Sequence, residues 1–360
     1  MDETIRLYFD VYSKFDKVYE RPYSDPEYED ILDLSVYSRN LLKDLGITLY
    51  KHQAEAVRLF REGNNVALVT PTASGKTLPY VISYLEEIYK DENAVALYIA
   101  PTNALINDQA KKIENYLKRV VPFVEVYPLT SGVSSSVRNR IRNSARFVLT
   151  NPEMLAYSLL LYNENWSRFW RNLKLIIVDE VHEMSGIKGC HFGNLLRIVN
   201  MINDVYGNNA RYFALSGTIG NPKEFIENLF DKKFFLIDKS TAGSKRIEFL
   251  LPNRMYISTT SLISRIIDTL NVFIFGLSKK VLVFVKSRKS VERVAKAIRS
   301  TKLSSLVAPY RSGYNYKDRL AIENMFRDGK LKGLVATSAF EMGIDIGDLD
   351  VVCVVGFPFF

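Results

Sequence analysis

The segment LVTPTASGKTLPY, residues 68–80, combines residue types that can hold phosphate groups. Gly75-Lys76-Thr77 stands between an apolar run that predicts a strand and another that predicts a helix, as a phosphate-binding loop requires. Backbone N–H groups at a helix N-terminus bind phosphate oxygens, the lysine reaches the β- and γ-phosphates, and the threonine hydroxyl is a ligand for Mg²⁺. The strict pattern has glycine where Thr70 stands. An ordinary strand-to-helix turn therefore stays open as an alternative.

Two adjacent acids, Asp179 and Glu180, follow the apolar residues LIIV in LIIVDEVHEM. The first acid can hold Mg²⁺, directly or through water, and the second can orient the attacking water. A solvated loop could also carry two acids, but a buried strand before them and a phosphate loop about a hundred residues earlier argue against it. A single histidine is more often structural, yet His182 would lie beside this water.

Polar and glycine-containing turns follow several other apolar runs. In open parallel sheets the ends of successive strands meet at the edge where ligands bind. Taken singly, each of these segments is an ordinary turn, whereas their order along the chain is specific. They are APTNALINDQ (100–109), LTNPEML (149–155), SGT (216–218), FVKSRKSVE (284–292), YRSGY (310–314) and ATSAFEMGIDIG (336–347).

With these motifs in this order, the chain resembles the DExH-box helicases of superfamily two over roughly residues 46–358. The likeness is strongest to the DNA-repair helicases that include the mitomycin repair factor and its Hrq-type relatives, and weaker to the archaeal Lhr-type helicases. The segments that carry it are TPTASGKT, PTNALINDQ, TNPEML, DEVHEMSGIKGCHFGNLLR, YRSGYNYKDRLAIE and TSAFEMGIDIGDLD.

The resemblance implies that ATP and Mg²⁺ are the cofactors. Gln53, in LYKHQAEAV, matches the glutamine that reads the adenine base, and Glu180 matches the catalytic base. Gly343 and Asp345 match the nucleotide-facing part of the second domain. The implied phosphate-loop contacts to ATP are Thr72, Ser74, Gly75, Lys76 and Thr77, and the implied magnesium ligands are Thr77 and Asp179. The implied catalytic group is Lys76, Asp179, Glu180 and His182.

The same resemblance implies contacts with nucleic acid. His182, Ser216 and Thr218 match residues that couple the nucleotide state to the bound strand. The positions that match contacts to the sugar–phosphate backbone are Thr102, Asn151, Arg288 and Thr337. Contacts to the backbone, rather than to bases, imply binding that is largely independent of base sequence.

The chain departs from the family pattern in two places. The segment SGT replaces the usual Ser-Ala-Thr, so Gly217 should loosen that turn while both hydroxyls remain. The family also has a Gln- and Arg-rich motif after the strand that here reads VVCVVGFP, and the sequence ends at Phe360 without it. We therefore expect a C-terminally truncated chain.

The elements that would position these residues alternate between strands and helices. Continuous runs rich in Val, Ile and Leu are typical of parallel strands covered on both faces. The predicted strands are 65–70, 95–100, 146–150, 173–179, 212–218, 281–287, 306–311, 333–338 and 351–358, and the predicted helices are 77–89, 105–117, 152–161, 191–205, 290–300 and 317–326. This alternation indicates two α/β doubly wound domains, which the resemblance identifies as RecA-like.

We predict an N-terminal leader of helical pieces at 1–45, a first RecA-like domain with the phosphate loop at 46–238, a linker at 239–256 and an incomplete second domain at 257–360. The linker is inferred because DKSTAGSKRIEFLLPN (238–253) loses the periodicity. Two similar units predict a site in the cleft between them.

The charge is unevenly distributed along the 360 residues, although the formal net charge is only +8. Residues 1–47 hold 6 Lys or Arg and 11 Asp or Glu, which leaves 42 basic and 29 acidic side chains, a net charge of +13, for the remainder. Such a surplus favours a polyanionic partner without proving one. In KKVLVFVKSRKSVERVAKAIRSTK (279–302), nine Lys or Arg accompany one Glu. This stretch is either a solvated helix face or a surface that follows phosphates.

The two cysteines, Cys190 and Cys353, form no metal-ligand pattern and favour a reducing, intracellular (cytoplasmic) setting. No apolar run is long enough to span a membrane, and the N-terminus lacks the apolar core of a signal peptide.

The sequence therefore predicts an ATP-dependent helicase or translocase that acts on single-stranded or tailed nucleic acid, with DNA favoured over RNA. Two alternatives remain: an ATP-gated nucleic-acid clamp that does not unwind, and a small-molecule P-loop kinase or transporter ATPase. A small-molecule P-loop kinase or transporter ATPase would explain Gly75-Lys76-Thr77 but not the second α/β unit.

Overall fold

The computed structural model describes residues 15–21, 23–217, 219–244, 247–252, 259–311, 313–337 and 349–356. The chain forms two compact units, each with its own sheet. One unit comprises Pro22–Lys245, and the other combines Met1–Arg21 with Arg246–Phe360. The predicted pair of α/β domains is therefore confirmed as the fold class.

The Pro22–Lys245 unit contains a seven-stranded parallel sheet with the strand order β4-β5-β3-β6-β7-β2-β8. The five inner strands, β5, β3, β6, β7 and β2, are fully or almost fully buried on both faces, as the continuous apolar runs predicted. The strands are β2 (Val66–Val69), β3 (Val95–Ile99), β4 (Val126–Leu129), β5 (Phe147–Thr150), β6 (Leu173–Val178), β7 (Arg211–Ser216) and β8 (Phe235–Ile237).

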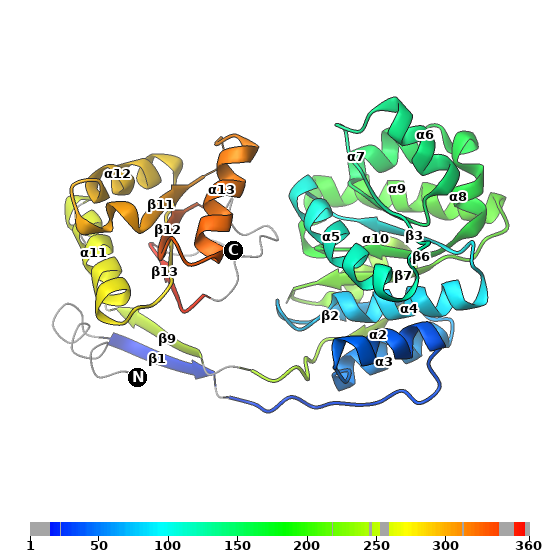
Figure 1. Cartoon of the computed structure of the whole chain (residues 1–360), viewed down its shortest axis with the longest axis horizontal. Coiled ribbons are helices and arrows are strands. Elements are labelled where there is room, and N and C mark those ends of the chain that lie inside the picture. The colour runs from blue at the N-terminus through cyan, green and yellow to red at the C-terminus, as the bar shows by residue number, and fades with distance from the viewer. Residues whose placement is uncertain are drawn as a thin grey trace. The chain divides into compact units, whose positions relative to one another are not determined.

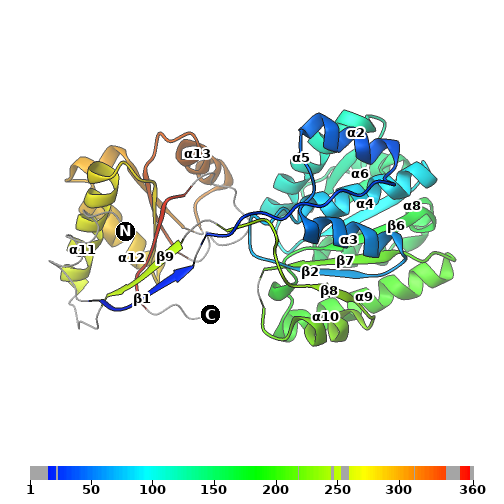
Figure 2. The same ribbon diagram turned by 90° about the horizontal axis from the view of Figure 1, so that it is seen from below.

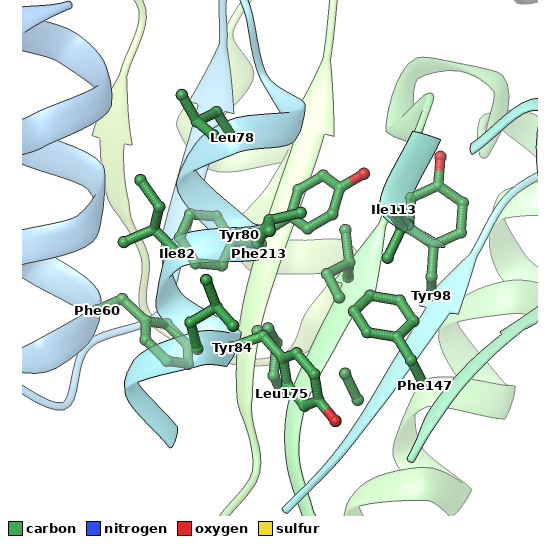
Figure 3. Close-up of a cluster of buried hydrophobic side chains, with 14 of the residues drawn as sticks. Phe60, Leu78, Tyr80, Ile82, Tyr84, Tyr98, Ile113, Phe147, Leu175 and Phe213 are labelled. Carbon is green, nitrogen blue, oxygen red and sulfur yellow. The ribbon is translucent and has the colours of Figure 1, made fainter. Parts of the chain in front are cut away.

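Helices cover both faces of this sheet and bury two separate hydrophobic cores (Figures 1 and 2). The first core lies under α2 (Val36–Leu45), α3 (Lys51–Arg61), α4 (Thr77–Lys90) and α5 (Asn103–Val120). Figure 3 shows part of it, with Tyr80, Tyr84 and Tyr98 among aliphatic and Phe side chains. The second core lies under α6 (Ser135–Ser144), η1 (Leu155–Leu160), α8 (Ser167–Asn172), α9 (Gly186–Val205) and α10 (Pro222–Phe230).

Local signals explain where several helices begin and end. Thr102 caps α5 by accepting a hydrogen bond from the Leu105 N–H, and Ser134 caps α6 in the same way. Gly46, with φ of 64°, ends α2 in the left-handed conformation that suits glycine. The predicted helix at 152–161 is instead a short α7 (Pro152–Met154) that continues as the π-helix η1.

The other unit contains a four-stranded parallel sheet in the order β11-β12-β10-β13. Its strands are β10 (Val281–Phe284), β11 (Val307–Tyr310), β12 (Gly333–Ala336) and β13 (Val351–Val354). One core includes α11 (Thr259–Asn271), η4 (Val272–Gly276) and α12 (Arg288–Ile298), and a second core includes α13 (Tyr316–Arg327). The second α/β unit is thus present with the predicted strand and helix alternation.

A two-stranded antiparallel sheet in the same unit was not predicted. It pairs β1 (Phe15–Arg21) with β9 (Ile247–Pro252), which are more than two hundred residues apart in sequence. The reading of 238–253 as an irregular connector is therefore wrong for the part that forms β9. The sequence does not predict this strand, because its pairing partner lies more than two hundred residues earlier, in the N-terminal region for which helical pieces are predicted.

Two further strands were also missed. β4 is an edge strand that contains Pro128 and is only partly buried, and β8 has three residues, so neither gives a continuous apolar run. Within the described part of the chain, no helix has both the length and the apolar character needed to cross a membrane.

Candidate phosphate-binding site

The phosphate loop, residues 70–76, connects β2 to α4 at the carboxyl edge of the seven-stranded sheet. Gly75 has φ of 80°, and a Cβ at this position would collide with the Gln53 amide nitrogen. Both the backbone conformation and the space therefore require glycine here. Ala73 is also left-handed, with φ of 63°, so the loop turns sharply before the helix.

Thr70, which replaces the glycine of the strict loop pattern, has a defined place in the structure. Its side chain is buried, and its hydroxyl lies 2.6 Å from the hydroxyl of Ser74. This hydrogen bond closes the loop across four residues. The departure from the pattern is thus accommodated, and Ser74 is buried inside the loop while Thr72 is exposed on it.

The Lys76 ammonium lies within the loop itself. It donates hydrogen bonds to the carbonyl oxygens of Thr70, at 2.7 Å, and Pro71, at 3.0 Å. Burial lowers the pKa of Lys76, and the nearby charges of Asp179 and Glu180 act in the opposite direction. The structure therefore brings the lysine and the two acids, about a hundred residues apart, into one electrostatic environment.

Gln53 packs directly against the loop from α3. Its side-chain amide donates to the Gly75 carbonyl at 2.9 Å, and its side-chain oxygen accepts from the Tyr50 N–H at 2.9 Å. The side chain is almost fully buried. The prediction that Gln53 reads an adenine base remains a prediction, but its position beside the phosphate loop is observed.

Asp179 follows β6 and is buried with both carboxylate oxygens hydrogen-bonded. Tyr98, from the neighbouring strand β3, donates its hydroxyl to Oδ2, and the Glu180 N–H donates to Oδ1 at 2.9 Å. Burial raises the pKa of Asp179, whereas these hydrogen bonds lower it. The carboxylate is thus held in one orientation at the strand end.

Glu180 adopts a left-handed backbone conformation with φ of 51°, unusual for a residue that is not glycine. Burial, and then the charge of Asp179, raise the pKa of Glu180. A carboxylate with a raised pKa accepts a proton more readily, which suits a general base.

His182 connects the acids to β7. Its Nδ1 lies 3.1 Å from the hydroxyl of Ser216, the last residue of β7, and 3.4 Å from Glu180 Oε2. The structure therefore brings together three of the predicted residues, from two adjacent strand ends. Thr218, the fourth member of this group, lies outside the described residues.

The residues predicted to hold Mg²⁺ fit that ion in their chemistry. Thr77 supplies a hydroxyl and Asp179 a carboxylate, and oxygen ligands are those that Mg²⁺ prefers. Among the residues that the structure describes, no group of three or more His, Cys, Asp or Glu side chains could hold a metal ion. A magnesium site at Thr77 and Asp179 therefore stays a prediction.

The backbone-contact candidates of this unit lie at two neighbouring strand ends. Thr102 follows β3 and Asn151 follows β5. Asn151 accepts from the Met154 N–H at 2.8 Å and donates to the Asn103 side-chain oxygen at 2.9 Å. Both predicted residues therefore act as helix caps, and contact with nucleic acid stays a prediction for each.

The candidates of the other unit also lie at strand ends. Arg288 is exposed at the start of α12, after β10, and Thr337 is buried at the end of β12, the neighbouring strand. Ser287 caps α12 by accepting from the Ser290 N–H at 3.1 Å. Gly343 and Asp345 lie outside the described residues, so their placement stays a prediction.

Three residues with site contacts were missed by sequence reasoning: His52, Tyr98 and Gln109. Tyr98 lies within the apolar run 95–100, and His52 stands beside Gln53 without a motif of its own. Gln109 accepts from the Tyr80 hydroxyl at 3.3 Å and lies 3.5 Å from the Thr77 hydroxyl. A polar group at a core position, as in Tyr98, was the available signal.

The family comparisons agree with these motifs. The profile of the DEAD/DEAH box helicase family matches residues 50–225, and that of the helicase conserved C-terminal domain matches residues 263–359. The chain is 33% identical over 318 residues to the uncharacterized ATP-dependent helicase YprA of Bacillus subtilis, covering 86% of this chain and 42% of YprA. It is 34% identical over 361 residues to the ATP-dependent helicase hrq1 of Schizosaccharomyces pombe, covering 93% of this chain and 33% of hrq1.

A solved structure of the helicase MrfA bound to DNA and AMPPNP is similar with a TM-score of 0.90 at 30% sequence identity. The match covers 99% of this chain and 51% of the MrfA chain. The chain thus spans about half or less of the length of the relatives named here. Together these matches confirm the resemblance that the motifs predicted.

Proposed function

Because the chain belongs to the DExH-box helicases of superfamily two, we propose that it hydrolyses ATP and uses the energy to move along nucleic acid, with DNA favoured. The observation that carries this proposal is the convergence of the phosphate loop with Asp179 and Glu180 at the carboxyl edge of one parallel sheet. Ligands bind at this edge in open α/β sheets.

Each residue has a distinct part in the proposed ATP site. The phosphate-loop amides and the N-terminus of α4 bind phosphate oxygens, and Lys76 exchanges its loop carbonyls for the phosphates. Bound Mg²⁺, held by Thr77 and Asp179, would neutralise charge on the phosphates. Glu180 orients the attacking water and accepts its proton.

His182 could transmit a change at the ATP site to the residues that bind the nucleic-acid strand. It contacts Glu180 on one side and Ser216 on the other, so a change at the acid reaches the end of β7. Strand affinity that differs between nucleotide states would convert hydrolysis into movement. Coupling of this kind is the translocase part of the proposal.

The proposed polymer contacts rest on charge and position. The sequence beyond residue 47 carries a net charge of +13, and Arg288 is exposed at a strand end. MrfA, which is similar over 99% of this chain, has been solved with DNA bound, and this favours DNA over RNA. We propose a single-stranded or tailed substrate held mainly through phosphates.

The test is ATP hydrolysis measured with single-stranded DNA, with RNA of the same length and without polymer. We expect DNA to stimulate hydrolysis more than RNA does. Hydrolysis that neither polymer changes would exclude a translocase and favour a small-molecule P-loop enzyme. Polymer-stimulated hydrolysis without unwinding of a tailed duplex would favour the clamp function instead.

A further inference from the structure

His52 occupies a buried position between the phosphate loop and a distant segment of the chain. It is the second residue of α3 and is 1% exposed. Its ring Nε2 lies 3.1 Å from the carbonyl oxygen of Ser74, within the loop. On the other side, its Nδ1 accepts a hydrogen bond from the Thr241 N–H at 3.1 Å.

The two backbone partners fix the state of the imidazole ring. A backbone N–H can only donate, so Nδ1 of His52 has no proton, and a carbonyl oxygen can only accept, so Nε2 carries the proton. The ring is therefore neutral and is present as the Nε2–H tautomer. Burial lowers the pKa of His52, the hydrogen bond to the Ser74 carbonyl opposes this shift, and the Lys76 charge adds to it.

The segment that holds the other side of the ring is itself well anchored. The Thr241 hydroxyl accepts from the His52 N–H at 3.0 Å, and the Thr241 carbonyl accepts from the Glu27 N–H at 2.9 Å. Ser24 and Ser244 exchange two backbone hydrogen bonds, of 3.1 and 3.0 Å. Residues 241–244 thus form a fixed support, immediately before the chain passes into the other unit at Arg246.

On this geometry we propose that His52 is a positioning residue that fixes the conformation of the phosphate loop by bridging the Ser74 carbonyl to Thr241. The inference rests on the proposed ATP site and adds a residue to it. Gln53, next in sequence, holds the adjacent carbonyl, that of Gly75, at 2.9 Å. Two successive loop carbonyls are therefore held by two successive residues of α3. The N–H groups of the same two peptide units, those of Gly75 and Lys76, are thereby pre-organised to receive phosphates.

Two substitutions separate the two sides of the bridge. An asparagine side chain places its polar atoms near Nδ1, so His52→Asn keeps a contact to Thr241 and loses the one to Ser74. A glutamine side chain reaches the position of Nε2, so His52→Gln keeps a donor for the Ser74 carbonyl. We expect His52→Asn and His52→Ala to weaken binding of a fluorescent ATP analogue by about fivefold, the effect of one ordinary hydrogen bond. His52→Gln should restore affinity to within about twofold of the parent chain.

A matched control separates positioning from loss of stability. Val57→Ala removes buried packing from the same helix, since Val57 is fully buried in the hydrophobic core. Thermal unfolding is measured for every variant beside analogue binding. The inference predicts that Val57→Ala lowers stability without changing affinity, whereas His52→Asn changes affinity.

A measurement on the unaltered chain covers the case in which the His52 variants do not fold. The sequence has only three histidines, so ¹⁵N-histidine labelling gives few ring signals. We expect a neutral Nε2–H tautomer for His52 with shifts that change when the analogue binds. An Nδ1–H tautomer, or signals that do not respond to nucleotide, would overturn the inference.

The outcomes distinguish this inference from the proposed function. A parent chain that binds no analogue would contradict the nucleotide site, and the role of His52 would fall with it. A parent chain that binds, with Asn and Ala variants that bind equally tightly, would leave the nucleotide site in place and refute the role of His52. Equal losses in the Gln, Asn and Ala variants would also refute it, because the donor to Ser74 would then be irrelevant.

Discussion

The strand ends of the two parallel sheets differ in how they hold their polar groups. At the seven-stranded sheet, Thr70, Asp179 and Ser216 are buried, and each is hydrogen-bonded to another site residue. At the four-stranded sheet, Arg288 and Lys289 after β10 are exposed, although Thr337 after β12 is buried. Both edges are the carboxyl ends of parallel strands, but within the described residues the first edge has buried groups that contact one another, whereas the charges that follow β10 at the second edge are exposed.

The two edges should therefore affect ligands through different ranges of electrostatic interaction. Buried groups with fixed partners act at short range, where geometry and low dielectric determine the effect. Exposed charges act through long-range attraction that salt screens. Substitutions of the polar groups at the strand ends of the seven-stranded sheet should therefore change ATP hydrolysis or nucleotide binding. Substitutions of the exposed charges at the strand ends of the four-stranded sheet should change polymer affinity and its salt dependence.

The largest effect is expected at Glu180. Glu180→Gln removes the proposed base but leaves Asp179 and Lys76, so hydrolysis should fall by about 10²–10⁴-fold while analogue binding stays within about twofold. Steady-state hydrolysis and analogue titration measure the two quantities. Glu183→Gln, three residues later, is the control and should hydrolyse normally. If the Glu180→Gln chain hydrolysed ATP as fast as the parent chain, Glu180 would not be the base.

The second prediction concerns the exposed charges. Replacing both Arg288 and Lys289 with alanine should weaken single-strand binding for every base sequence and flatten the salt dependence by up to about 1.4 in slope, from about 0.7 per phosphate contact. Titrations at several salt concentrations measure this slope. The control Lys118→Ala with Arg119→Ala removes equal charge. These residues lie in the last turn of α5, at the opposite end of that helix from the strand-end edge of the seven-stranded sheet. Equal loss in both double variants would mean that net charge, rather than this surface, determines binding.

Much of the fold was predictable because its strands are buried on both faces and therefore read as continuous apolar runs. The residues of the phosphate loop and of the segment Asp179–His182 were predictable because each segment directly follows such a strand in the sequence. The contacts that hold them were not, because Tyr98 is 81 residues from Asp179, and His52 is 189 residues from Thr241. A single sequence gives no signal for a pairing of that kind, and the same reason hid the pairing of β1 with β9.

The third prediction tests one of these hidden contacts. Tyr98→Phe removes the hydroxyl that donates to Asp179 Oδ2 but keeps the ring in the core. Hydrogen bonds to charged groups are worth about 1.5–3 kcal/mol, so the Mg²⁺ concentration for half-maximal analogue binding should rise about tenfold. Tyr84→Phe is the matched control, since its buried hydroxyl donates to the carbonyls of Ala94 and Arg146 instead. A similar magnesium requirement in both variants would show that Tyr98 only fills space.

The smallest effect on nucleotide binding is expected at Thr241. Thr241→Val keeps the backbone N–H that donates to His52 Nδ1. It removes the hydroxyl, which accepts from the His52 backbone N–H and also lies 2.9 Å from His52 Nδ1. The free energy of unfolding should fall by about 1–3 kcal/mol, because a buried N–H loses its partner. Analogue affinity should nevertheless change by less than about twofold, since the ring still bridges to Ser74. Denaturant unfolding and analogue titration give the two values. A fivefold loss of affinity would mean that the hydroxyl, and not the backbone of the support segment, orients the ring.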